Sequence, residues 1–161
     1  MKIGLISDTH DNVDQILKAK EIFKMNNVKL ILHAGDVVAG KTVEFFEGIE
    51  TWFIDGNCNT DPETMEKKKK QINGKYLGNF AEFELEGKKL CMYHGHNKVK
   101  LSELIQSKKY DYIITGHTHQ MVNEKIGKTM VINPGAHYYS ATNTIAILDI
   151  EKGEVEFIEV K

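Results

Sequence analysis

The segment that decides the fold is residues 2–10, which reads KIGLISDTH. Its first part, residues 2–7, is short and apolar, as expected for a strand that is buried on both faces. The polar residues Asp8, Thr9 and His10 follow directly, where this strand would end. The same order, an apolar run and then a polar cluster, recurs four more times along the chain.

The four further clusters are Gly35-Asp36, Gly56-Asn57, His94-Gly95-His96 and Gly116-His117-Thr118-His119. In open α/β sheets, ligands bind in the crevice at the carboxyl ends of the strands. Five strands that end in Asp, Asn or His would therefore deliver these side chains to one crevice. The Asp-x-His and His-x-His spacings leave both side chains on one side of an extended segment.

These side chains form a mixed set of oxygen and nitrogen donors, without any need for a thiolate. Seven candidate ligands are too many for one ordinary ion, but they suit two ions that share a carboxylate. Two-metal sites with ions about 3.5–4 Å apart are typical of phosphate-ester hydrolases. The sequence therefore favours a metal-dependent hydrolase.

Around these clusters, hydrophobic periodicity predicts an alternation of strands and helices, followed by a strand-rich second half. We expect strands at residues 2–7, 30–33, 51–54, 112–115, 130–132, 144–150 and 155–160, and a hairpin over 80–93. We expect helices over residues 13–23, 41–46 and 101–105, with another beginning at 61–63. Asp11 or Asn12 is a plausible cap for the first helix, and residues 123–128 have the composition of a turn. The mixture predicts a single α/β domain over residues 1–161, with two sheets packed together and helices outside.

Composition excludes several classes of protein. The chain has 161 residues and 21 basic residues, all of them Lys, against 23 acidic ones, for a formal charge of −2. This balance and the lack of Arg disfavour a nucleic-acid partner. Two distant cysteines form neither a disulfide scaffold nor a zinc knuckle. Polar residues interrupt the apolar run near the N-terminus and the uncharged stretch 129–148, so we expect a cytoplasmic protein without a membrane segment.

The five clusters, in this order and spacing, resemble the motif series of the calcineurin-like metallophosphoesterases from Asp8 to about Gly135, where Asn133-Pro134-Gly135 is also similar to the family. The short chain and the Cys after Asn57 resemble the YfcE-type phosphodiesterase subgroup. The resemblance implies a four-layer αββα fold with two mixed sheets and a small phosphodiester or other phosphate ester as substrate. Attack on phosphorus would come from a hydroxide held between two metals. Mn²⁺ is common in the family, and Ni, Fe, Co or Zn also occur.

The resemblance also implies a role for each matching residue. Asp8, His10 and His119 would hold one metal, and Asn57, His94 and His117 the other. Asp36 would bridge the two ions. Asn57 would also belong to the catalytic group.

The sequence departs from the family pattern at Cys58, where many relatives have a His that protonates the leaving oxygen. A thiol is a poor acid for this role, so we expect Cys58 to line the substrate site. His96, two residues after His94, is our hypothesis for the group that contacts or protonates the phosphate. Without a strong acid, substrates with good leaving groups should be favoured.

Other polar residues have simpler interpretations. We expect His33 to support the site or the core rather than bind metal. His137 has no clear partner in the sequence, so we expect it to lie at the surface or to pack in its loop. The lysines at 67–70 fit a solvated helix face better than a rim for an anionic substrate. Trp52, Phe45 and Phe46 should fill the core. A non-catalytic scaffold of the same fold and a small nuclease remain the alternative functions, and a homo-oligomer is left open.

Overall fold

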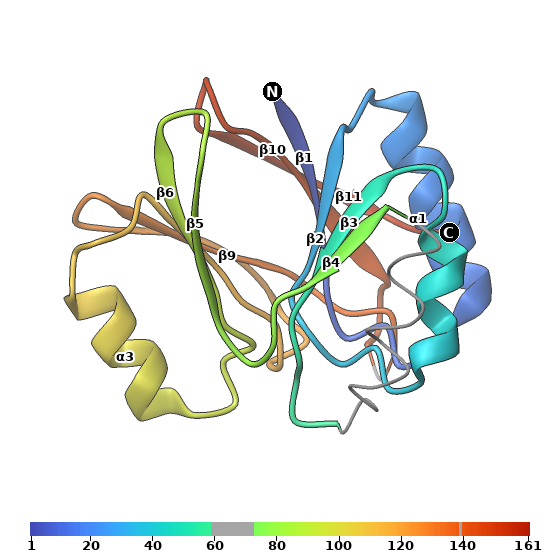
Figure 1. Ribbon diagram of the computed structural model, residues 1–161, viewed down its shortest axis with the longest axis horizontal. Helices are drawn as coiled ribbons and strands as arrows, with labels where there is room; N and C mark the ends of the chain where they lie inside the picture. The colour runs from blue at the N-terminus through green and yellow to red at the C-terminus, as the bar shows by residue number, and fades with distance from the viewer. Residues whose placement is uncertain (59–72, 139) are drawn as a thin grey trace.

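The structure is a computed structural model that describes residues 1–58, 73–138 and 140–161. The helix predicted to begin at residues 61–63 and the lysines at 67–70 lie outside the described residues. The described helices are α1 (Val13–Met25), the 3₁₀ helix η1 (Gly40–Phe46) and α3 (Lys98–Gln106) (Figure 1). The strands are β1 (Lys2–Ile6), β2 (Leu30–His33), β3 (Glu50–Phe53), β4 (Gly74–Tyr76), β5 (Ala81–Leu85), β6 (Lys88–Met92), β7 (Tyr112–Ile114), β8 (Met121–Ile126), β9 (Thr129–Pro134), β10 (Thr144–Asp149) and β11 (Glu154–Glu159).

These strands form two mixed sheets. The six-stranded sheet has the order β11-β10-β1-β2-β3-β4, in which β1 to β4 are parallel and β10 and β11 antiparallel to their neighbours. The five-stranded sheet has the order β5-β6-β7-β9-β8, with β6, β7 and β9 parallel. Each sheet therefore has a parallel centre, whose strands end on the same edge and can carry a shared site.

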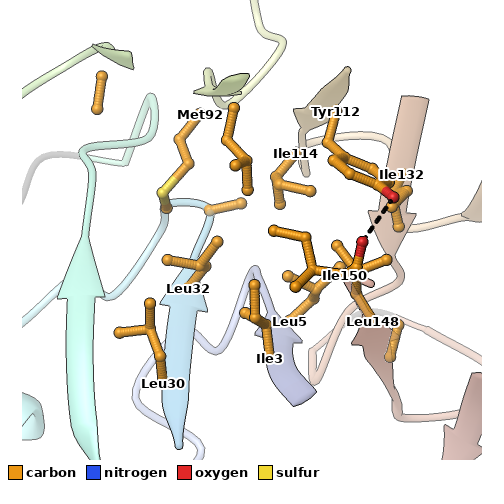
Figure 2. Packing of buried hydrophobic residues seen from close by; sticks show 14 of the residues in the cluster. Ile3, Leu5, Leu30, Leu32, Met92, Tyr112, Ile114, Ile132, Leu148 and Ile150 are labelled. Carbon is orange, nitrogen blue, oxygen red and sulfur yellow. Dashed lines mark hydrogen bonds between the residues drawn. The ribbon is translucent and has the colours of Figure 1, made fainter. Parts of the chain in front are cut away.

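The two sheets pack face to face through apolar residues at alternate strand positions (Figure 2). Ile3 and Leu5 of β1 point into this layer, whereas Ile6 lies on the opposite face of the sheet. Successive side chains of a strand point to opposite faces of the sheet, so both faces of β1 are covered by apolar residues. At the edge of the layer the Tyr112 hydroxyl donates to the carbonyl of Ile150 over 3.4 Å.

Helices cover the two outer faces. Ile16, Ala19 and Phe23 form one stripe of α1 and pack with η1 on the six-stranded sheet. Leu101 and Leu104 of α3 pack on the outside of the five-stranded sheet. The result is the order helix, sheet, sheet, helix (Figure 1), which confirms the predicted four-layer αββα fold. None of the described helices is long and apolar enough to cross a membrane.

Phe46 is buried, and Phe45 and Trp52 pack half-buried against the core, as expected. Asn12 is the residue before α1, but its side chain makes no capping hydrogen bond. Its amide instead donates to the carbonyl of His137, and the Asp11 carboxylate accepts from the backbone N–H of Ala39.

Two strands were not predicted correctly. Residues 123–128 are not a turn, because β8 continues to Ile126 and pairs with β9, leaving only Gly127 and Lys128 to reverse the chain. β8 lies at the edge of its sheet and most of its residues are exposed, so it lacks the apolar alternation that marks a strand. The three-residue β4 was missed for a similar reason.

Candidate metal centre

Five loops at the carboxyl ends of β1, β2, β3, β6 and β7 carry all the metal ligands that the sequence predicts. Both sheets contribute, and their strand ends meet at one end of the sandwich, at the bottom of Figure 1. The loops bring Asp8, His10, Asp36, Asn57, His94, His117 and His119 into one cluster of short contacts. The convergence that was argued from strand ends is therefore present in the structure.

One side of the cluster contains Asp8, His10 and His119. The Nε2 atom of His119 lies 3.3 Å from Oδ1 of Asp8. The rings of His10 and His119 are 5.7 Å apart between centroids. Asp8 is fully buried, and its Oδ2 accepts hydrogen bonds from the Ser7 hydroxyl at 2.5 Å and the His117 backbone N–H at 3.0 Å. These bonds fix the orientation of the carboxylate.

The other side contains Asn57, His94 and His117. The Oδ1 atom of Asn57 lies 3.0 Å from Nε2 of His94 and 2.8 Å from Nδ1 of His117. Three donor atoms from three different loops thus face one another. His94 is fully buried, whereas Asn57 is exposed, so this side opens toward solvent.

Asp36 lies between the two sides. Its Oδ2 is 3.5 Å from Nε2 of His10 and 3.4 Å from Nε2 of His94, and its Oδ1 accepts the Cys58 backbone N–H at 2.9 Å. Burial opposes the negative charge of Asp36, but the contacts with His94 and Cys58 outweigh it and lower the pKa of the carboxyl. Burial also opposes protonation of His94, but Asp36 and Asp8 outweigh it and raise the pKa of the imidazole. Asp36 is therefore a carboxylate that both sides can share.

The donor atoms fit divalent cations. Nε2 of His10 is buried and has no hydrogen-bond partner among the described residues, so it is available as a ligand atom for a cation. Nδ1 of His94 lies 2.8 Å from the carbonyl oxygen of Ala34, so an Nδ1–H donor leaves Nε2 facing the carboxylates. Three groups, Asp8–His10–His119, Asp8–Asp36–His94 and His10–Asp36–Cys58, each offer ligand atoms within 4.8 Å of one another.

Glycines let the loops approach this closely. A Cβ on Gly56 would overlap the carboxylate of Asp36, and one on Gly116 would overlap the hydroxyl of Ser7. Any side chain at either position would therefore push a ligand-bearing loop aside. The glycines of the Gly-Asn and Gly-His pairs belong to the site for this reason.

His96 and Cys58 lie beside the cluster. His96 is exposed, and its ring centroid is 5.9 Å from that of His94 and 6.4 Å from that of His117. Cys58 is half-buried, and burial together with Asp36 raises the pKa of its thiol. A protonated thiol presents no negative charge to an anionic substrate. Their roles toward substrate stay predictions.

His137 does not lie at the surface and does not lack a partner: its side chain is fully buried in the loop after β9. Its Nε2 lies 3.0 Å from the carbonyl oxygen of Thr144, its backbone N–H donates to the carbonyl of Asp8 over 3.2 Å, and burial lowers the pKa of the ring to about 4. Two further residues lie beside the site: Asn133 belongs to the segment that resembles the family, and Tyr138 was missed. Asn133 donates to the Gly116 carbonyl at 2.7 Å, and Tyr138 lies 5.4 Å from His10 between ring centroids. The available signal for Tyr138 was its position just after the Asn133-Pro134-Gly135 segment, which begins within β9.

Two mixed sheets in a helix-flanked sandwich, with clustered carboxylates and imidazoles at the strand ends, define the class of metallophosphoesterases. The chain belongs to the calcineurin-like phosphoesterase superfamily, whose domain model matches residues 1–153. A phosphodiesterase from Methanocaldococcus jannaschii is 40% identical in an alignment of 159 residues, and the match covers 96% of each chain. A solved archaeal phosphodiesterase superimposes with a TM-score of 0.93 at 37% identity, over 99% of each chain. YfcE, a phosphoesterase from E. coli, shares the fold with a TM-score of 0.67 at 19% identity over both full chains.

Proposed function

We propose that this protein is a phosphodiesterase that hydrolyses small phosphodiesters with the help of two divalent metal ions. The observation that carries the proposal is the position of Asp36, whose Oδ2 lies within 3.5 Å of His10 on one side and 3.4 Å of His94 on the other. One carboxylate between two sets of donors is what a pair of neighbouring ions needs. Relatives named as phosphodiesterases, at 37% and 40% identity, support the same activity.

In this proposal Asp8, His10 and His119 would hold one ion, Asn57, His94 and His117 would hold the other, and both could share Asp36. When bound, two divalent ions would supply Lewis-acid polarisation of the phosphate and activation of the attacking water. We propose Mn²⁺ as the working metal, and the mixed oxygen and nitrogen donors would also accept Ni, Fe, Co or Zn.

The chain's own residues would orient the substrate. His96 stands exposed beside His94 and His117, where an imidazole N–H can donate to a phosphate oxygen or to the leaving group. Cys58 lines the same side with a protonated thiol. A thiol is a poor general acid, so esters with good leaving groups should react fastest.

A non-catalytic scaffold of this fold would have no need for a complete set of metal ligands, and here all seven donors are in contact. The acidic net charge and the absence of Arg disfavour a nuclease. We also propose one domain over residues 1–161, which the match over 1–153 supports. A reducing compartment such as the cytoplasm suits the two free thiols, Cys58 and Cys91.

The test is hydrolysis of bis-p-nitrophenyl phosphate by protein stripped with a chelator and reloaded with each metal. The loaded wild type should turn over, and Asp36→Asn, which keeps the side-chain shape, should lose more than about 100-fold in kcat/KM, because loss of a mere supporting partner of a ligand already costs 10–100-fold. Asp111→Asn is the matched control, since this carboxylate accepts the Lys89 N–H at the opposite end of β7. Equal turnover by Asp36→Asn and Asp111→Asn would contradict the proposal.

A further inference from the structure

The imidazole of His33, at the end of β2, is fully buried directly beneath the metal centre. Its ring packs against two aromatic side chains: Phe53 stacks on it with 5.6 Å between centroids, and Phe46 meets it edge-on at the same separation. These contacts fix the plane of the ring. The two ring nitrogens therefore point in set directions.

Each ring nitrogen has one partner. The backbone N–H of Gly35 donates to Nδ1 over 3.3 Å, and Nε2 lies 3.0 Å from the hydroxyl oxygen of Thr9. Because a backbone N–H can only donate, Nδ1 must be the unprotonated nitrogen, and Nε2–H then donates to Thr9. Burial, with a smaller contribution from His137, lowers the pKa of His33 to about 3 and keeps the ring neutral. The ring thus has one defined tautomer.

The two partners belong to the two loops that carry the buried carboxylates. Thr9 lies between Asp8 and His10, and Gly35 immediately precedes Asp36. Two backbone hydrogen bonds join the same two loops. The Asp8 N–H donates to the Gly35 carbonyl and the His10 N–H donates to the Asp36 carbonyl, both over 3.0 Å. The imidazole of His33 adds a fully buried side-chain link to this connection between the loops.

The loops need such a link because their backbone is strained. Asp8, His10 and Asp36 have φ angles of 53°, 41° and 60°, in the left-handed region that non-glycine residues rarely adopt. Such conformations cost of order 1–3 kcal/mol each and persist only where the surroundings hold them. Without that support, each loop would relax and its ligand would move.

We propose that His33 is a positioning residue that ties the Asp8–His10 loop to the Asp36 loop and thereby holds Asp36 within reach of both halves of the metal centre. The inference rests on the proposed two-metal function. In this role the buried His33 binds no metal itself but sets the spacing of the residues that do. Loss of the link should weaken metal binding even though every ligand is still present.

Thr9→Val tests this link, because valine has the shape of threonine but cannot accept the Nε2–H. We expect the dissociation constant of Mn²⁺, measured by calorimetric titration of the metal-free protein, to rise 10–100-fold, as for other supporting partners of metal ligands. Thr9→Ser restores an acceptor and should return the constant to within about threefold of the wild-type value. Thr51→Val is the matched control: its hydroxyl is equally buried and donates to the Ile49 carbonyl over 3.0 Å, in β3. It should leave the dissociation constant unchanged.

The outcomes separate this inference from the function on which it rests. Wild-type metal affinity in Thr9→Val, alongside weak binding by Asp36→Asn, would overturn the role of His33 and leave the two-metal site intact. Equal weakening in Thr9→Val and Thr51→Val would also overturn it, because a general loss of stability would then explain both. If the wild-type protein binds no metal at all, the proposed function fails and this inference fails with it.

Discussion

Replacing His33 with glutamine should change how stability depends on pH, because the folded protein keeps this imidazole uncharged. In the unfolded chain a histidine takes up its proton near pH 6.5, whereas burial lowers the pKa of the folded His33 to about 3. Between these values the unfolded state binds more protons, so acid favours unfolding. The contribution of the neutral His33 to the free energy of unfolding is fully present above about pH 6.5. It is lost progressively as the pH falls and does not change further below about pH 3.

The magnitude follows from these two values. One pKa unit corresponds to about 1.4 kcal/mol, so lowering the pH from 7.5 to 5.0 should remove about 2 kcal/mol through His33 alone. With a urea m-value of about 2 kcal/mol/M, this is a loss of about 1 M in the unfolding midpoint. The His33→Gln variant lacks the titrating imidazole, so it should not show this acid-dependent loss of stability. We expect it to be less stable than the wild type at pH 7.5.

Urea unfolding of both proteins, with chelator present at pH 7.5 and 5.0, measures the effect. Every other titrating group is common to the two proteins, so the difference between them isolates residue 33. The stability gap between wild type and His33→Gln should shrink by about 2 kcal/mol on acidification. A gap of the same size at both pH values would refute the buried neutral state of the ring.

Three further substitutions test other parts of the molecule. Gly56→Ala places a Cβ on the Asp36 carboxylate, whose Cγ would be 2.6 Å away; we expect elemental analysis to show a loss of bound metal, and full occupancy would contradict the close approach. Leu5→Ala, fully buried between the sheets, should lower the unfolding free energy by about 2–5 kcal/mol, whereas Leu17→Ala, 39% exposed, should cost less than about 1 kcal/mol. His96→Ala should retain its metal yet change the pH profile of phosphodiester hydrolysis; an unchanged turnover and profile would remove His96 from the mechanism.

The ligand cluster could be predicted because its signal is local. Each predicted ligand follows an apolar segment such as residues 2–7. Parallel strands of a sheet have their carboxyl ends at the same edge, and this does not depend on how the side chains pack. The helices of the described residues could also be predicted from local sequence. For example, Ile16, Ala19 and Phe23 of α1 recur at helical spacing. Such features depend on residues that are close together in the sequence, so they can be predicted without knowledge of the tertiary contacts.

The features that were missed depend on contacts between distant segments. β8 is a strand because backbone hydrogen bonds pair it with β9, not because its exposed side chains alternate. His137 is buried because the chain after β9 passes beneath Asp8, which its local sequence does not reveal. The tautomer of His33 depends on donors from two separate loops, and only the assembled structure shows them.

We propose that two metal ions share Asp36, and anomalous diffraction from Mn²⁺-loaded crystals would show directly where the ions lie. We expect two peaks about 3.5–4 Å apart at the strand ends, with Asp36 between them. The ligands should divide as Asp8, His10 and His119 at one peak and Asn57, His94 and His117 at the other. A single peak, or peaks that Asp36 does not contact, would contradict the account.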